Sequence, residues 1–217
     1  MASHAEGLNA KSQGNYSHAE GNTSVAIGVA AHAEGILSEA QGDGSHAEGN
    51  SVASGKYAHS EGSATVSSGK YAHAEGDQSV ASGDNSHAEG FKTAATNTYS
   101  HAEGNQTTAS GSGSHAEGGY TQAKSTNAHA EGDQTQANGA NSHAQGYSTI
   151  AGGNNSHAEG DSTTASGLGS HAQGYRTQAT NDYAHAQGNT TIASGKYSSA
   201  EGSNTSAVGQ SSHAEGK

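Results

Sequence analysis

The stretch NSHAEGDSTTASGLGSHAQG, residues 155–174, contains the phrase Ser-His-Ala-Glu/Gln-Gly twice, with histidines at positions 157 and 171. The phrase recurs along the whole chain of 217 residues and contains its 15 histidines. Successive histidines keep this spacing, except that it is one residue shorter near Asn50 and twice as long at the end, where Ser199 stands at the histidine position. A fixed short period is the signature of a repeat architecture. We therefore predict one repeat domain, residues 1–217, of about fifteen 14-residue coils.

Each repeat consists of two half-repeats with the common pattern small, variable, Ala, variable, Gly. Residues 79–83 (SVASG) show the first half-repeat and residues 86–90 (SHAEG) the second. Alternation with period two indicates strands, with the small residues on one face and the variable ones on the other. Frequent glycine and the missing 3.6-residue period argue against a helix, and the missing large a/d residues argue against a coiled coil. Two strands and two corners per repeat predict an all-β parallel β-roll, a solenoid whose coils stack about 4.8 Å apart.

Glycine ends each half-repeat, and we expect it to take a positive φ at a corner of the coil. Asn97 and Asn181 replace glycine in the first half-repeat. Asparagine is among the non-glycine residues most often found in the left-handed region, so these two replacements fit that expectation. Ser125, at the same position of another repeat, fits it less well.

The composition limits the core and the partners. Hydrophobic residues make up 29% of the chain, against about 45–50% in ordinary globular domains, so no large apolar core can form. A net charge of −12 with 8 Lys and Arg argues against nucleic acid and anionic membrane surfaces as partners. No apolar run approaches the roughly 18 residues of a membrane span, which argues against membrane insertion. A lone chain would expose two flat sheets, and we infer that the protein is not a monomer.

Several half-repeats resemble a known family. Residues 24–28 (SVAIG), 79–83 (SVASG) and 205–209 (TSAVG) are similar to the head repeats of YadA-like trimeric autotransporter adhesins. The resemblance implies a left-handed, homotrimeric parallel β-roll at the bacterial cell surface. It also implies a non-enzymatic structural and adhesive module in virulence, which attaches multivalently to extracellular-matrix protein or surface glycan. This chain departs from the family in that polar residues mostly replace the Val/Ile pair.

The His-Ala-Glu-Gly runs are also similar to segments of phage and prophage tail-fibre proteins. The alternative function is therefore the shaft of a tail fibre in a virion.

The histidine phrase itself suggests three kinds of chemistry. His157 and Glu159 are two residues apart and should project from the same face of a strand. Neutral imidazole suits zinc or nickel, but structural zinc needs four tetrahedral ligands, which a flat row in one chain does not supply, so we expect no metal and no other cofactor. Ser156 should point away from His157, which separates a nucleophile from its base, so we expect no enzyme activity and no catalytic residue.

The third possibility is that the histidine phrase has a structural role, and this is the role that we predict. Because the His and Glu positions vary least, we expect them to line the three-fold axis that the resemblance implies, where His and Glu of different chains hydrogen-bond. The trimer-interface candidates are His18, Glu20, His46, Glu48, His73, Glu75, His87, Glu89, His101, Glu103, His115, Glu117, His129, Glu131, His157 and Glu159. The alternative places the other sheet on the axis, with Val25, Ile27, Val52, Val66, Val80, Ile150 and Ile192. The sequence names no ligand.

Overall fold

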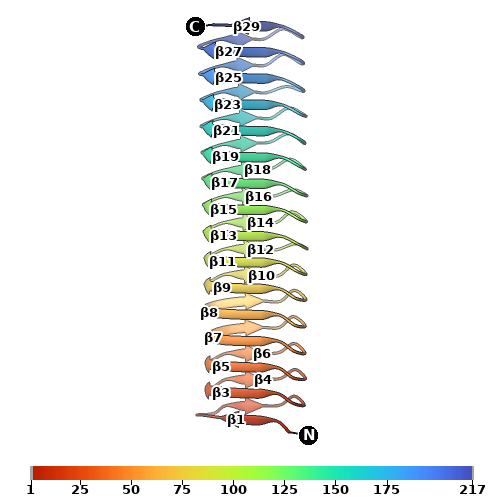
Figure 1. The fold of residues 1–217 in the computed structure, drawn as a ribbon, viewed down its shortest axis with the longest axis vertical. Helices are drawn as coiled ribbons and strands as arrows, with labels where there is room; N and C mark the ends of the chain where they lie inside the picture. The colour runs from red at the N-terminus through yellow and green to blue at the C-terminus, as the bar shows by residue number, and fades with distance from the viewer. Residues whose placement is uncertain (1, 217) are drawn as a thin grey trace. The chain divides into compact units, whose positions relative to one another are not determined.

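The computed structural model describes residues 2–216, and the chain divides into two units, Met1–Thr107 and Thr108–Lys217. Each unit is an all-β parallel solenoid whose coils follow one another in chain order (Figure 1). The coils are about 14 residues long, and the two units together contain about 15 turns, as the period predicts. Among the described residues, no helix has the length and hydropathy needed to cross a bilayer.

In most of the first unit, strands that carry the histidines alternate with shorter strands. The histidine strands are β1 (His4–Glu6), β3 (His18–Asn22), β5 (His32–Ile36), β7 (His46–Ala53), β8 (His59–Ser67), β9 (His73–Asp77), β11 (His87–Phe91) and β13 (His101–Asn105). The shorter strands are β2 (Lys11–Ser12), β4 (Val25–Ala26), β6 (Glu39–Ala40), β10 (Val80–Ala81) and β12 (Ala94–Ala95).

The second unit repeats this order. Its long strands are β15 (His115–Gly119), β17 (His129–Asp133), β19 (His143–Tyr147), β21 (His157–Asp161), β23 (His171–Tyr175), β25 (His185–Asn189), β27 (Ser199–Ser203) and β29 (His213–Glu215). Its short strands are β14 (Thr108–Ala109), β16 (Gln122–Ala123), β18 (Gln136–Ala137), β20 (Ile150–Ala151), β22 (Thr164–Ala165), β24 (Gln178–Ala179), β26 (Ile192–Ala193) and β28 (Ser206–Ala207).

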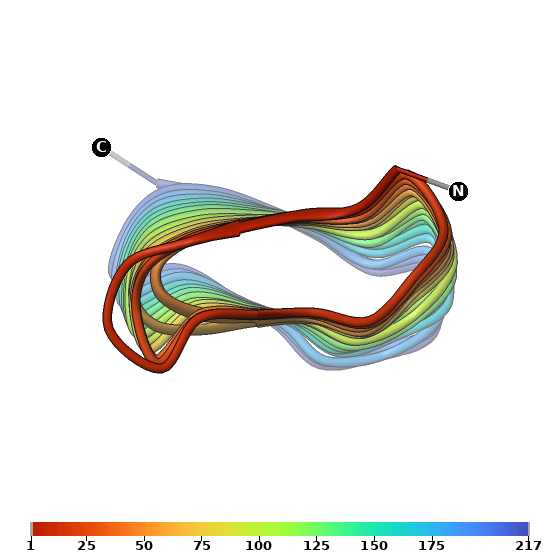
Figure 2. The ribbon, with the colours of Figure 1, turned by 90° about the horizontal axis from the view of Figure 1, so that it is seen from below.

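Successive coils pair in register, so that like residues lie side by side. In β21 and β23, His157 pairs with His171 and Ala158 with Ala172. The short strands β20 and β22 pair in the same way, with Ala151 opposite Ala165. Seen end on, each coil is a flattened loop with a long strand on one side and a short strand on the other (Figure 2).

The shortened repeat near Asn50 lacks one corner residue. Where other coils have a residue with positive φ before the first half-repeat, such as Ala64 with φ 55°, the shorter coil has none. β7 is continuous through both half-repeats, and so is β8, which contains Ala64. The pairing of β7 with β8 shifts register between Asn50 and Ser51 to absorb the difference. The histidine spacing predicts the missing residue at this point.

The interior of each coil contains only small side chains. Ala158 and Ala165 are fully buried, and Ser156 and Thr163 are also buried. The buried serine of the second half-repeat is tied to the backbone, since the Oγ of Ser156 donates to the Gly153 carbonyl at 2.6 Å. The predicted division into a small inward face and a variable outward face is confirmed.

Glycine is required at the two positions of each repeat for different reasons. The glycine of the second half-repeat takes the positive φ that we predicted, and Gly160 has φ +119°. The glycine of the first half-repeat has an ordinary φ, but a Cβ on Gly153 would lie 1.9 Å from the Gly167 carbonyl oxygen of the next coil. Close stacking of the coils, and not backbone conformation, therefore selects glycine there.

The expectation for the three glycine replacements was wrong. None of Asn97, Asn181 and Ser125 has a positive φ. Each of the two asparagines instead uses its Oδ1 to accept a hydrogen bond from the next backbone N–H, at 2.9 Å in both cases.

The left-handed residues lie at two other corner positions of the coil. One position precedes the Ser/Ala-His pair, as at Tyr57 (φ 58°) and Asn155 (φ 56°), and the other precedes the first half-repeat, as at Gln78 (φ 60°) and Thr190 (φ 56°). Positive φ is unfavourable for β-branched and bulky residues, so these corners are held by the coils on either side of them.

A matched pair of glycines tests this account of the coil. Gly160→Ala combines a positive φ with a Cβ that would lie 2.0 Å from the Gly174 carbonyl oxygen, whereas a Cβ on Gly152 would meet nothing closer than 3.6 Å. We expect Gly160→Ala to reduce the free energy of unfolding by about 3 kcal/mol or more, and Gly152→Ala to leave it unchanged or raise it by up to about 1 kcal/mol. Urea unfolding followed by circular dichroism measures both, and equal effects would contradict the stacking geometry.

Candidate functional site: the His/Glu face

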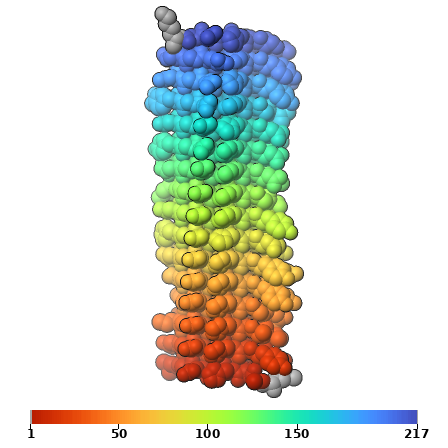
Figure 3. Space-filling view, in the orientation of Figure 1, coloured from red at the N-terminus to blue at the C-terminus, as the bar shows by residue number. Residues whose placement is uncertain are grey.

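The histidine and glutamate side chains of the long strands project away from the interior in both units. We call this surface the His/Glu face; in each unit it comprises the His and Glu or Gln residues of the Ser/Ala-His-Ala-Glu/Gln-Gly phrases. All 16 predicted interface candidates lie on it, at partly or fully exposed positions of β3, β7, β9, β11, β13, β15, β17 and β21. The space-filling view shows that side chains of successive coils form rows within each unit (Figure 3).

The imidazole rings stack from coil to coil. The ring centroids of His32 and His46 are 4.8 Å apart with an angle of 5° between the planes, and those of His59 and His73 are 4.8 Å apart with 2°. In the second unit, His129 and His143 are 4.7 Å apart at 15°. These separations equal the distance between neighbouring strands, so the ladder of backbone hydrogen bonds fixes the ring spacing.

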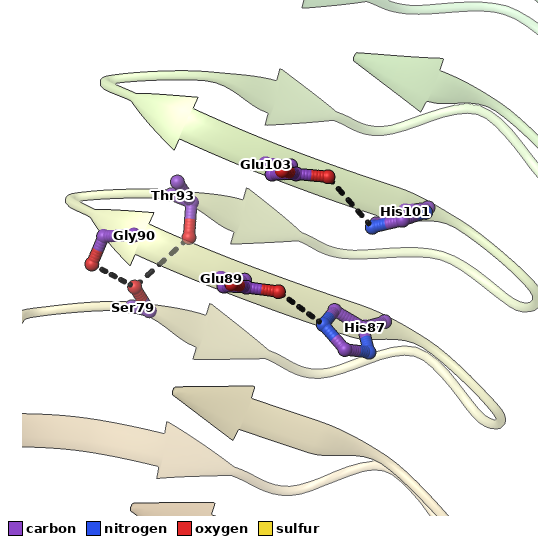
Figure 4. A network of polar contacts seen from close by, with 7 residues as sticks. All are labelled: Ser79, His87, Glu89, Gly90, Thr93, His101 and Glu103. Carbon is purple, nitrogen blue, oxygen red and sulfur yellow. Dashed lines mark hydrogen bonds and ion pairs between the residues drawn. The ribbon is translucent and has the colours of Figure 1, made fainter. Parts of the chain in front are cut away.

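Some histidines contact the glutamate of their own strand instead. Figure 4 shows His87 and His101 directed toward Glu89 and Glu103, with Nε2 to Oε2 distances of 3.4 and 3.9 Å. His87 leaves the parallel stack, since its ring and that of His73 are inclined at 72°. His115, 3.9 Å from Glu117, remains parallel to His129 at 2°. The same figure shows Ser79 inside the coil, where its Oγ donates to the Gly90 carbonyl and accepts from Thr93.

Glutamine replaces glutamate at three positions of the second unit. The side-chain amides of Gln145 and Gln173 donate to Oε2 of Glu131 and Glu159, at 3.4 and 3.1 Å. A carboxylate in either place would set two like charges side by side. The glutamines therefore both remove charge repulsion and orient the neighbouring carboxylates.

Burial lowers the pKa of seven histidines on this face below the ordinary value of 6.5. Loss of water around the charged ring is the main cause, neighbouring imidazoles add to it, and the glutamates of the face act in the opposite direction. The seven are His32, His46, His59, His73, His129, His143 and His171. These rings are therefore neutral at pH 7.

Two groups on the face bring metal-binding atoms together. The ligand atoms of His32, Glu34 and His46 all lie within 4.8 Å of one another, and so do those of His129, Glu131 and His143. His32, Glu34 and His143 were not among the predicted interface candidates, although the same five-residue phrase marks them in the sequence. No pattern in the sequence shows which pairs of rings remain parallel.

The serine that precedes each histidine faces the interior. Ser156 is 2% exposed and donates to the Gly153 carbonyl. It does not contact His157, whose Nε2 lies 3.5 Å from Oε2 of Glu159. The predicted separation of Ser156 from His157 is confirmed.

Tyrosines lie at the corners beside this face. The Tyr57 and Tyr71 rings stack with centroids 5.3 Å apart, and Tyr183 and Tyr197 do the same. A Cβ on Gly44 would lie 2.6 Å from the Tyr57 ring, so this tyrosine covers glycine backbone.

Short strands, a short fixed period and an interior of Ala, Ser and Thr define a parallel β-solenoid repeat protein. The model described as YadA head domain repeat matches residues 19–45, 60–86, 74–90, 144–170, 179–205 and 200–217, which together make up more than half of the chain. The chain therefore belongs to the family of YadA head domain repeats. No curated protein matches it.

Membership of this family confirms the resemblance seen in the sequence. The family consists of structural adhesin modules rather than enzymes, and its heads are in general homotrimeric and exposed at the cell surface. The chain is thus a head-like module of the trimeric autotransporter adhesin type.

Acidification is expected to destabilise the fold. The unfolded chain binds protons at these histidines near pH 6.5, whereas the folded chain binds them only at lower pH, so stability is complete above pH 6.5 and is lost as the pH falls through the folded pKa values. We expect the thermal midpoint at pH 5.5 to lie below that at pH 7.5 by on the order of a few degrees.

Paired substitutions assign this effect to the histidine rows. His73→Gln together with His171→Gln should reduce the difference between the two midpoints, and Gln136→Ser on the other sheet should not. Circular dichroism melts at both pH values provide the measurement, and equal midpoints for the unmodified chain would contradict the account.

Proposed function

We propose that residues 1–217 act as one repeat domain, the head of a trimeric adhesin at the surface of a bacterial cell. Three copies of the left-handed β-roll pack side by side and present their remaining faces for multivalent attachment to extracellular-matrix protein or surface glycan. Family membership supports the trimer and the adhesive role. The half-repeat sequence continues through the boundary between the two units, as in residues 107–111 (TTASG), which supports a single domain.

The His/Glu face is the surface that we propose for the trimer axis. The observation that carries this choice is a set of buried ring nitrogens: Nε2 is buried and lacks a hydrogen-bond partner among the described residues at His18, His32, His46, His59, His73, His129, His143 and His171. Buried polar atoms in native proteins are normally hydrogen-bonded, and an unpaired one costs about 1–3 kcal/mol. Rotation of the rings toward the axis would bring these nitrogens to acceptors on glutamates of a neighbouring chain.

Multivalency follows from the repeat. Every coil presents outward side chains at the same spacing, so one trimer offers many regularly spaced weak contacts to a fibrous or polymeric ligand. Linked weak contacts raise the overall affinity through effective concentration, without any single strong site. This mechanism suits an adhesin that must hold a cell to an extended surface.

Light scattering on the purified chain tests the assembly and its axis together. We expect a mass three times that of one chain at pH 7.5. Glu75→Lys with Glu89→Lys would bring like charges of three chains together and should lower the trimer fraction. Val66→Lys with Val80→Lys changes the other sheet in the neighbouring coils and should leave the trimer intact.

A monomeric unmodified chain would contradict the trimer. If the valine variant lowered the trimer fraction and the glutamate variant did not, the other sheet would lie on the axis. Binding of the intact trimer to arrays of matrix proteins and glycans tests adhesion, and we expect affinity to rise with ligand density. An intact trimer that binds none of them would favour the shaft of a phage or prophage tail fibre.

A further inference from the structure

We infer that the His/Glu face binds divalent transition-metal ions at two places in each chain, at His32, Glu34 and His46 and at His129, Glu131 and His143. The inference goes beyond the proposed function, because all three ligands of each site come from one chain and from one unit. It does not require a trimer. Where the His/Glu face lies on the axis, the metal ion takes the place of a neighbouring chain's glutamate as the partner of the four ring nitrogens concerned.

The distances between ligand atoms suit a metal ion at both places. In each set the three ligand atoms lie within 4.8 Å of one another. Zinc binds imidazole nitrogen and carboxylate oxygen at about 2.0–2.2 Å, which places the ligand atoms of one ion roughly 3–4 Å apart. The side chains lie on partly exposed strand positions, so small χ rotations bring them to that spacing without moving the backbone.

The Nε2 ring nitrogens at both places are buried and unpaired within the described part of the chain. Nε2 of His32, His46, His129 and His143 has no hydrogen-bond partner among the described residues. The rings of each pair are nearly parallel, at 5° and 15°. Because the lone pair of an imidazole nitrogen lies in the ring plane, a χ rotation of one or both rings directs the two nitrogens at one ion. A metal ion between them would coordinate both nitrogens and end their lack of a partner.

Among the described residues, other parts of the face lack this grouping of three ligand atoms, including His59 and His73, whose rings are also parallel. Glu89 and Glu159 are directed to the histidine of their own strand, at 3.4 and 3.5 Å, and are not placed between two rings. In the strand of His185 the carboxylate is replaced by Gln187, which has no charge to offer. At the second site, by contrast, the Gln145 amide donates to Oε2 of Glu131 and so holds this carboxylate in place.

The ligand set indicates the class of metal. Two imidazoles and one carboxylate suit Zn²⁺, Ni²⁺ or Cu²⁺ rather than Ca²⁺ or Mg²⁺, which prefer sets made wholly of oxygen ligands. Three protein ligands leave coordination positions open to water. The sequence argues against a closed site with four protein ligands, whereas these sites are open ones with three.

The test is equilibrium dialysis of the full chain, prepared without a polyhistidine tag, against Zn²⁺, with bound zinc measured by elemental analysis. We expect two ions per chain. His46→Gln should remove one of them, and His46→Gln with His143→Gln should remove both. His185→Gln, in the same row but beside a glutamine, is the matched control and should leave two.

Carboxylate variants keep the test valid if the histidine variants fold poorly. Glu34→Gln with Glu131→Gln preserves the side-chain shape and should weaken zinc binding about tenfold or more. Absence of zinc binding, equal binding by all variants, or the same loss in His185→Gln would overturn the inference. Light scattering of the same samples separates this result from the proposed function. A trimer that binds no zinc contradicts only the metal sites, and a monomer that binds zinc contradicts only the trimer.

Discussion

The structure depends on the small distance between the two sides of each coil. A loop that closes once per repeat leaves room only for Ala, Ser and Thr between its strands, and Ala158, Ala165 and Thr163 fill that space completely. Because so little apolar area is buried, side-chain packing alone cannot hold the chain together. The in-register backbone ladder supplies the order, and the glycines allow neighbouring coils to approach closely enough to form it.

This constraint also explains the outward faces. Inward positions cannot vary, so all chemical variety lies on the outside, and the repeat copies each outward residue into a row. Stacked histidines and glutamates are the result, with ring spacing fixed by the strands rather than by any affinity between the rings. A face that repeats with the strand spacing suits assembly with identical chains and multivalent attachment, and at two places it brings the ligand atoms of two imidazoles and a carboxylate within 4.8 Å of one another.

Much of the fold could be predicted because the period gives both the coil and its two faces. The alternation in residues 79–83 was sufficient to place Ala81 inside and Val80 outside, and the histidine spacing located the shortened coil at Asn50. The roles of Asn97 and Asn181 could not be predicted, because glycine is selected both by positive φ and by close approach, and only coordinates separate these causes. Which glutamates turn to their own histidine, as Glu89 does, depends on χ angles that the repeat leaves free.

Two adjacent residues of β22 offer the most direct test of the narrow interior. Ala165 points inward and is fully buried, and Thr164 points outward, where other coils have Val80 or Ile150. The measurement is the free energy of unfolding in urea of Ala165→Val and Thr164→Val. The account predicts a loss of about 1–3 kcal/mol for Ala165→Val and a change within about 0.5 kcal/mol for Thr164→Val. Equal stability of the two variants would contradict an interior filled by alanine and hydroxyl side chains alone.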